Sequence, residues 1–192
     1  MPAMNRNEIH IDRVTRIIHM GLLIFGVLAW LTGDWAEDFE KGGHLGFTIH
    51  SWLGIGLSVS VLLRIIYGIV GPANVRFSKW VPFNRERLVA VREDIIGLLH
   101  FRLPDRPTHA GLSGLVQSFG LLLFSWMAAT GSAMFFLIEP GTKTGGLVEV
   151  LKEVHEVGDV LIPVYLTLHV GAVVLHSLAG DAIWRRMFSG KP

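Results

Sequence analysis

One stretch without a charged side chain decides the fold, and it reads LGFTIHSWLGIGLSVSVLL from Leu45 to Leu63. Its length is close to the roughly 20 residues with which an α-helix crosses about 30 Å of hydrocarbon. A lone segment in lipid can satisfy its backbone hydrogen bonds only as a helix. We therefore expect a transmembrane helix here, which continues past Arg64 until Pro72 ends it.

Three further apolar runs resemble the first, so that four spans are predicted. They cover about residues 14–33, 45–71, 110–138 and 155–181. Hydrophobic residues make up 51% of the 192-residue chain and charged residues only 17%, a surplus of apolar side chains that suits contact with lipid. The predicted fold is all-α, a single integral membrane domain built as a four-helix bundle, with Pro163 expected to kink the fourth span. The net charge of +1 gives no indication of nucleic-acid binding.

The distribution of Lys and Arg predicts the direction of the spans. Basic residues gather at both ends of the chain and between the second and third spans: Arg6, Arg13, Arg16, Arg76, Lys79, Arg85, Arg87, Arg92, Arg102, Arg106, Arg185, Arg186 and Lys191. The other two connections hold only Lys41, Lys143 and Lys152. By the positive-inside rule, both termini and the long middle connection are predicted to be cytoplasmic.

The middle connection, from Val75 to Leu103, carries apolar residues near helical spacing among its arginines. This pattern predicts an amphipathic helix on the inner leaflet of the membrane. A solvated cytoplasmic helix is the alternative.

Histidine is the feature of this chain that most needs an explanation. The chain has nine His and no Cys, so disulfides, thiolate metal sites and covalently attached c-type haem are excluded. Histidine within lipid is costly and needs a partner. Four candidates lie in or near the spans: His19, His50, His155 and His169.

The depth of these four residues predicts two pairs. His50 and His155 lie where the second and fourth spans enter from the outer side. His19 precedes the outer end of its span by 14 residues, and His169 follows His155 by 14 residues, so both lie about 21 Å below the outer surface. The first pair is therefore His50 with His155 and the second is His19 with His169. Two imidazoles on opposite sides of a haem iron make a low-spin electron carrier.

The same spacing predicts which side chains share a helix face. Fourteen residues at 100° each fall about 40° short of four turns, so His155 and His169 would project from nearly one face of a continuous helix. Arg64 follows His50 by 14 residues and would share its face at the inner depth. A haem propionate would suit the Arg64 guanidinium; the alternative is that Arg64 reaches lipid phosphates.

Other histidines are alternatives to these ligands. His176 is the main rival of His169, seven residues further along the same span, and His44 in the outer loop could replace His50. A surface role is expected for the remaining three, which are His10, His100 and His109. Glycines near the pairs, among them Gly54 and Gly131, would let a flat macrocycle approach the backbone, although small residues also serve ordinary helix packing.

Several motifs together resemble the bacterial cytochrome b561 family and the b-type cytochrome subunits of nickel–iron hydrogenases. They occur in family order along nearly the whole chain: RVTRIIH at 13–19, IHSWLG at 49–54, LRIIYGIVGP at 63–72, HE at 155–156 and LHV at 168–170. The resemblance implies two haem b groups, the outer one held by His50 and His155 and the inner one by His19 and His169. It also implies a bacterial inner membrane and electron exchange between the quinone pool and a redox partner, such as a c-type cytochrome or an oxidoreductase subunit.

Two other classes of function are alternatives to this one. A transporter could use intramembrane His and Arg64 as a proton or metal path, but Asp159 is nearly the only acidic residue available to it. A membrane anchor for a peripheral enzyme would explain four spans but not paired histidines. A homodimer is an alternative to a monomer.

Overall fold

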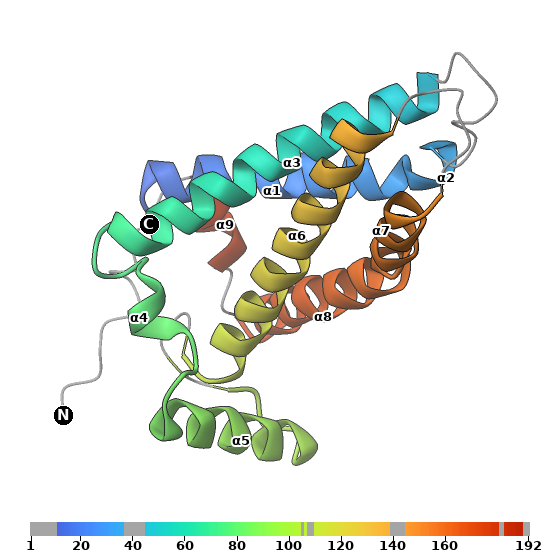
Figure 1. The fold of residues 1–192 in the computed structure, drawn as a ribbon. Coiled ribbons are helices and arrows are strands. Elements are labelled where there is room, and N and C mark those ends of the chain that lie inside the picture. Colours follow the sequence, from blue (N-terminus) through green and yellow to red (C-terminus); the bar gives the residue numbers. More distant parts are fainter. Residues whose placement is uncertain are drawn as a thin grey trace. The chain divides into compact units, whose positions relative to one another are not determined.

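The computed structural model describes residues 11–36, 45–104, 106, 110–138, 145–180 and 183–189. Within these residues every regular element is helical (Figure 1). The elements are α1 (Arg13–Leu31), α2 (Gly33–Ala36), α3 (Leu45–Val70), α4 (Phe77–Trp80), α5 (Arg85–Leu99), α6 (Leu112–Leu137), α7 (Leu147–Glu156), α8 (Gly158–Leu178) and α9 (Ile183–Ser189).

The predicted spans are confirmed as helices of membrane-crossing length. Among the described residues, four segments are long and apolar enough to cross a membrane: Arg13–Leu31, Leu45–Val70, Leu112–Leu137 and Leu147–Leu178. Large apolar side chains remain exposed along them, for example Ile17, Leu122 and Leu178. In water the exposure of these side chains would cost free energy, whereas in lipid they contact hydrocarbon and the cost does not arise. The chain is therefore a multi-pass helical membrane protein.

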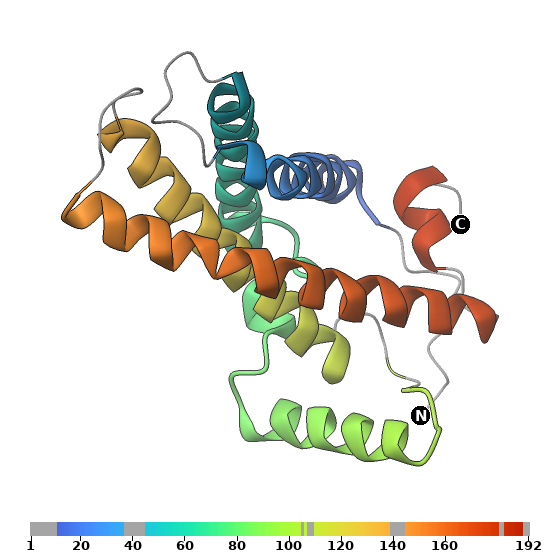
Figure 2. The same ribbon diagram turned by 90° about the vertical axis from the view of Figure 1, so that its right-hand side faces the viewer.

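The fourth span differs from the prediction, because it begins at Leu147 and is not one uninterrupted helix. Val157 separates α7 from α8, and the two helices follow one another directly in Figure 2, in orange and red. Val157 keeps helical dihedral angles, φ −56° and ψ −25°. Pro163 lies inside α8 and cannot donate a backbone hydrogen bond to the preceding turn. His155 thus lies on α7 and His169 on α8, and the expectation that the two project from one face stays a prediction.

The ends of the helices are set by local side-chain chemistry. Asp12 caps α1, since its carboxylate accepts hydrogen bonds from the backbone N–H of Thr15 at 2.9 Å and from the Thr15 hydroxyl at 2.7 Å. The Tyr67 hydroxyl, near the end of α3, donates to the same carboxylate at 2.9 Å. Burial tends to raise the pKa of Asp12, but the hydrogen bonds from Thr15 and Tyr67 outweigh it and hold the pKa below its usual value.

The chain forms two compact units, which are described separately. The first contains residues 1–16, 66–120 and 165–192, and the second contains residues 17–65 and 121–164. In the second unit, α1, α3 and α6 meet at Gly26, where a Cβ atom would lie 3.1 Å from Phe124 and 3.7 Å from Leu57. Glycine allows this close approach, as small residues do in membrane helix packing. Ser58 of α3 and Ser132 of α6 add a hydrogen bond of 3.0 Å between their hydroxyls.

In the first unit, Asp94 connects α5 to the start of α6. Its carboxylate accepts from Arg106 Nε at 2.6 Å and from the backbone N–H of Leu112, in the first turn of α6, at 2.8 Å. Arg106 also pairs with Glu93 at 2.6 Å. The hydrogen bonds to Asp94 and then to Glu93 raise the pKa of Arg106. These contacts hold α5 beside the first turn of α6, as both ribbon views show (Figures 1 and 2).

The connection between the second and third spans contains two helices, α4 and α5, where one was predicted. Asn84 caps α5 by accepting from the backbone N–H of Arg87 at 2.9 Å. Trp80 and Val91 are buried, whereas Leu88 and Leu99 are exposed. The exposed apolar side chains agree with an amphipathic helix, and its contact with the inner leaflet stays a prediction.

Candidate haem-binding site

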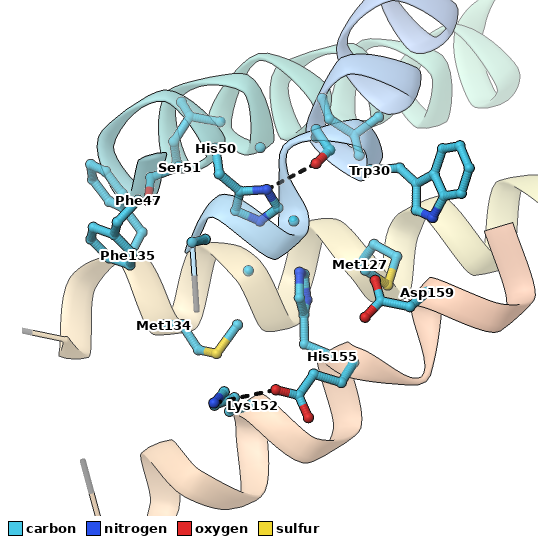
Figure 3. Close-up of a pocket in the computed structure, with 18 of the residues that line it drawn as sticks. Trp30, Phe47, His50, Ser51, Met127, Met134, Phe135, Lys152, His155 and Asp159 are labelled. Carbon is cyan, nitrogen blue, oxygen red and sulfur yellow. Dashed lines mark hydrogen bonds and ion pairs between the residues drawn. The ribbon is translucent and has the colours of Figure 1, made fainter. Parts of the chain in front are cut away.

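Two imidazoles face each other in the second unit. His50 comes from α3 and His155 from α7, and their rings point toward one another across a pocket (Figure 3). The ring centres are 6.2 Å apart and the ring planes are perpendicular, at 90°. The two residues are 105 positions apart in the sequence, so it is the fold that brings them together.

His50 is oriented by the backbone of α1. Its Nδ1 lies 2.9 Å from the carbonyl oxygen of Ala29, near the end of that helix. A carbonyl can only accept, so Nδ1 carries the hydrogen and Nε2 keeps its lone pair. The same carbonyl also accepts from Thr32, from its backbone N–H at 3.2 Å and from its hydroxyl at 3.1 Å.

His155 is oriented by a side chain instead. Its Nδ1 lies 2.7 Å from the hydroxyl oxygen of Thr130 on α6. Thr130 donates its own proton to the carbonyl oxygen of Trp126 at 2.9 Å, so its oxygen is an acceptor toward the ring. His155 therefore also carries its hydrogen on Nδ1 and has a lone pair on Nε2, as a metal ligand requires.

The spacing of the two rings fits one metal atom between them. Imidazole nitrogens bind a transition metal such as zinc at about 2.0 Å. With ring bonds of about 1.33 Å, the centre of an imidazole lies about 1.1 Å from each ring atom. Two axial imidazoles on one metal would then have centres about 6.2 Å apart, and the observed separation of 6.2 Å agrees with this value.

The pocket around the imidazoles suits a flat apolar group. Its lining includes aromatic and thioether side chains and four glycines: Trp30, Phe47, Phe135, Met127, Met134, Gly26, Gly33, Gly54 and Gly131. Gly131 lies against an imidazole of the pair, since a Cβ there would lie 3.1 Å from Cε1 of His155. A side chain at this position would push the imidazole out of place.

Charged residues lie on the same pocket, on α7 and the first turn of α8. Lys152 forms an ion pair of 3.4 Å with Glu156, and Asp159 also lines the pocket. Both partners of the ion pair are more than a third exposed, so it contributes little to stability. Lys152 is the cation closest in sequence to His155 and could meet an acidic group of a bound ligand.

The pair of opposed imidazoles matches the ligand set of a haem. Tetrahedral zinc takes three or four protein ligands, whereas a haem takes only axial ones because the macrocycle supplies four nitrogens. A pair of imidazoles is therefore the donor set that a b-type haem needs.

The second predicted pair is divided between the two units. His19 on α1 and Arg64 on α3 belong to the second unit and are half-buried. His169 belongs to the first unit, where its ring stacks on Tyr165 with centres 5.5 Å apart and an angle of 19°. The pairing of His19 with His169 thus stays a prediction, as does the role of Arg64.

The rival histidines are placed only in part. His176 is half-buried on α8, and His100 is exposed at the end of α5, with its Nδ1 2.8 Å from the carbonyl oxygen of Ile96. His10, His44 and His109 lie outside the described residues. His50 and His155 are the candidates that the structure brings together.

Thr130 and the carbonyl of Ala29, which orient the two rings, were not predicted from the sequence. Thr130 lies 25 residues before His155, on another helix, and a threonine in an apolar helix is usual. The carbonyl of Ala29 leaves no trace in a side-chain pattern. A sequence reveals a role where that role favours particular residue types, as an N-cap or a metal ligand does. Accepting a hydrogen bond from an imidazole favours no residue type, so neither group could be found in the sequence.

Four helical spans with an opposed pair of imidazoles in an apolar pocket are typical of membrane-embedded haem proteins. The family model for prokaryotic cytochrome b561 matches residues 10–190 of the chain. The chain belongs to this family, so it is a bacterial membrane cytochrome of the b type that functions in electron transfer. Searches of the curated proteins and of the solved structures found no match.

Proposed function

We propose that the protein carries electrons across the membrane through two bis-histidine haem b groups. The outer haem is held by His50 and His155. The observation that supports this most strongly is the 6.2 Å separation of the two ring centres, together with the hydrogen bonds of both Nδ1 atoms. A haem b between two imidazoles accepts and releases one electron and leaves no coordination position for a substrate.

The inner haem is held by His19 and His169, with Arg64 near a propionate. The support is the 14-residue spacing of both His169 from His155 and Arg64 from His50. An α-helix rises about 1.5 Å per residue, so 14 residues correspond to about 21 Å along a helix axis. That spacing would separate two haem layers while keeping both within the hydrocarbon core, about 30 Å thick.

The protein itself positions the ligands and excludes water. Ala29 and Thr130 fix the ring nitrogen that faces the pocket, and the apolar lining keeps the charge of the iron from being hydrated. The electrons pass between the quinone pool and a redox partner outside the membrane, either a c-type cytochrome or an oxidoreductase subunit.

Haem content per chain tests the proposal. Purified protein assayed as the pyridine haemochrome is expected to contain two haem b groups. His50→Ala and His155→Ala should each remove the same haem, and His19→Ala and His169→Ala the other. His176→Ala is the matched control, because it removes a half-buried histidine from the same helix as His169. Two haems retained in His155→Ala would refute the outer site, and two retained in His169→Ala the inner one.

We also propose that both termini and the connection between α3 and α6 face the cytoplasm. The absence of Cys makes the test direct, because single cysteines can be introduced without a background. Arg102→Cys should resist a membrane-impermeant maleimide in intact spheroplasts, and Gly145→Cys should react. The reverse labelling pattern would show that the protein has the opposite orientation and would refute this proposal.

A further inference from the structure

The two histidines of the outer site are each next to a threonine, but the two threonines differ in what they do. Thr130 on α6 and Thr32 after α1 are almost equally buried, at 9% and 8% exposure. Each hydroxyl donates to the carbonyl oxygen four residues earlier, at 2.9 Å for Thr130 and 2.8 Å for Thr32. Both oxygens are therefore acceptors for a ring N–H.

Only one of these oxygens is the principal partner of an imidazole. Thr130 Oγ1 lies 2.7 Å from Nδ1 of His155. Thr32 Oγ1 is 3.5 Å from Nδ1 of His50, at the limit of a hydrogen bond, and that nitrogen already bonds the carbonyl of Ala29 at 2.9 Å. The orientation of His155 thus depends on a side chain, whereas that of His50 depends on the backbone.

We infer that Thr130 is a positioning residue for His155 that sets the reduction potential of the outer haem, and that Thr32 has no such role. The inference rests on the proposed function, in which His155 is an axial ligand. A hydrogen bond from the distal ring N–H fixes the tautomer and the rotation of the ring and makes the other nitrogen a stronger donor. A stronger donor favours the oxidised iron and so lowers the potential.

The hydrogen bond that orients His155 can be removed by a substitution at position 130, whereas the one that orients His50 cannot be removed by a substitution at position 29. A backbone carbonyl cannot be removed by changing a side chain, so the Ala29 bond to His50 persists in every variant of residue 29 except those that shift the helix. Thr130 can be replaced by valine, which has nearly the same shape and no hydroxyl. His155 Nδ1 then loses its acceptor in a buried position.

The experiment compares Thr130→Val, Thr130→Ser and Thr32→Val in the full-length, haem-loaded protein. Redox titration followed by visible spectroscopy gives the midpoint potential of each haem, and electron paramagnetic resonance gives the low-spin ferric signals. In Thr130→Val we expect one potential to rise and one ferric signal to shift, with the other haem unchanged. Thr130→Ser keeps the hydroxyl and should behave like the wild type, as should Thr32→Val.

The outcomes distinguish this inference from the proposed function. Unchanged potentials and signals in Thr130→Val, with one haem lost in His155→Ala, would overturn the role of Thr130 and leave the haem ligand in place. Two haems retained in His155→Ala would overturn the proposed ligand itself. Loss of one haem in Thr130→Val but not in Thr130→Ser supports the inference, whereas equal loss in both would attribute the effect to packing and overturn it. If Thr130→Val does not accumulate, Thr130→Ala gives the same comparison.

Discussion

Gly131 offers a graded test of how tightly the outer site is built. A Cβ at this position would lie 3.1 Å from Cε1 of His155. Carbon atoms in favourable contact are about 3.5–4.0 Å apart, so in Gly131→Ala the ring must move by roughly 0.4–0.9 Å. Metal–ligand distances are held within about 0.2 Å, so a movement of this size weakens the bond between His155 and the metal.

The effect of Gly131→Ala on the stability of α6 is opposite to its effect on haem binding. Alanine is favoured over glycine inside a helix by about 1 kcal/mol, so loss of haem from Gly131→Ala cannot come from a weaker α6. A leucine at the same position has no room beside the ring. We therefore expect Gly131→Ala to bind the outer haem partly and Gly131→Leu to lose it while keeping the inner one.

The assay is the pyridine haemochrome of purified protein, normalised to chain concentration. Haem content should fall from two per chain in the wild type to between one and two in Gly131→Ala and to one in Gly131→Leu. Gly97→Ala is the matched control, because Gly97 is also helical and its Cβ would meet Arg102 at an ordinary 3.4 Å. Two haems with unaltered spectra in Gly131→Leu would refute the placement of His155 in a tightly packed site.

Three further changes test contacts outside the imidazole pair, each by thermal unfolding in detergent. Asp12→Ala should lower stability by about 1 kcal/mol at pH 7, as loss of an N-cap does. Because the pKa of Asp12 lies below 3.8 in the folded protein, its contribution is complete above that pH and lost as the pH falls further, so wild type and variant should converge in acid. Asp94→Ala should lower the free energy of unfolding by roughly 3 kcal/mol, because it removes the buried carboxylate that pairs with Arg106. Glu93→Ala removes a side chain that is 59% exposed and should lower it by less than about 1 kcal/mol. Ser58→Ala removes the hydroxyl pair with Ser132 and should cost about 0.6 kcal/mol, whereas a change above about 2 kcal/mol would mean that this pair, rather than apolar packing, joins α3 to α6.

The spans were predictable because the bilayer imposes a simple rule on the sequence. A helix such as α3 must be about 20 residues long and almost free of charge, whatever it packs against. The boundary between α7 and α8 at Val157 was not predicted, although Gly158 and Asp159, which follow it directly, are both weak helix formers. The kink expected at Pro163, which lies inside α8, stays a prediction.

The apolar runs, the absence of Cys and the histidines within the spans determined by themselves that this is a helical membrane protein with imidazole available as a metal ligand. They did so because lipid tolerates few polar groups, so each one that remains is informative. Only the tertiary structure decided that His50 and His155 face each other at 6.2 Å and that Ala29 and Thr130 direct their ring nitrogens. A hydrogen bond between helices depends on how those helices are rotated and how deep they lie, and no local pattern along the chain encodes either quantity.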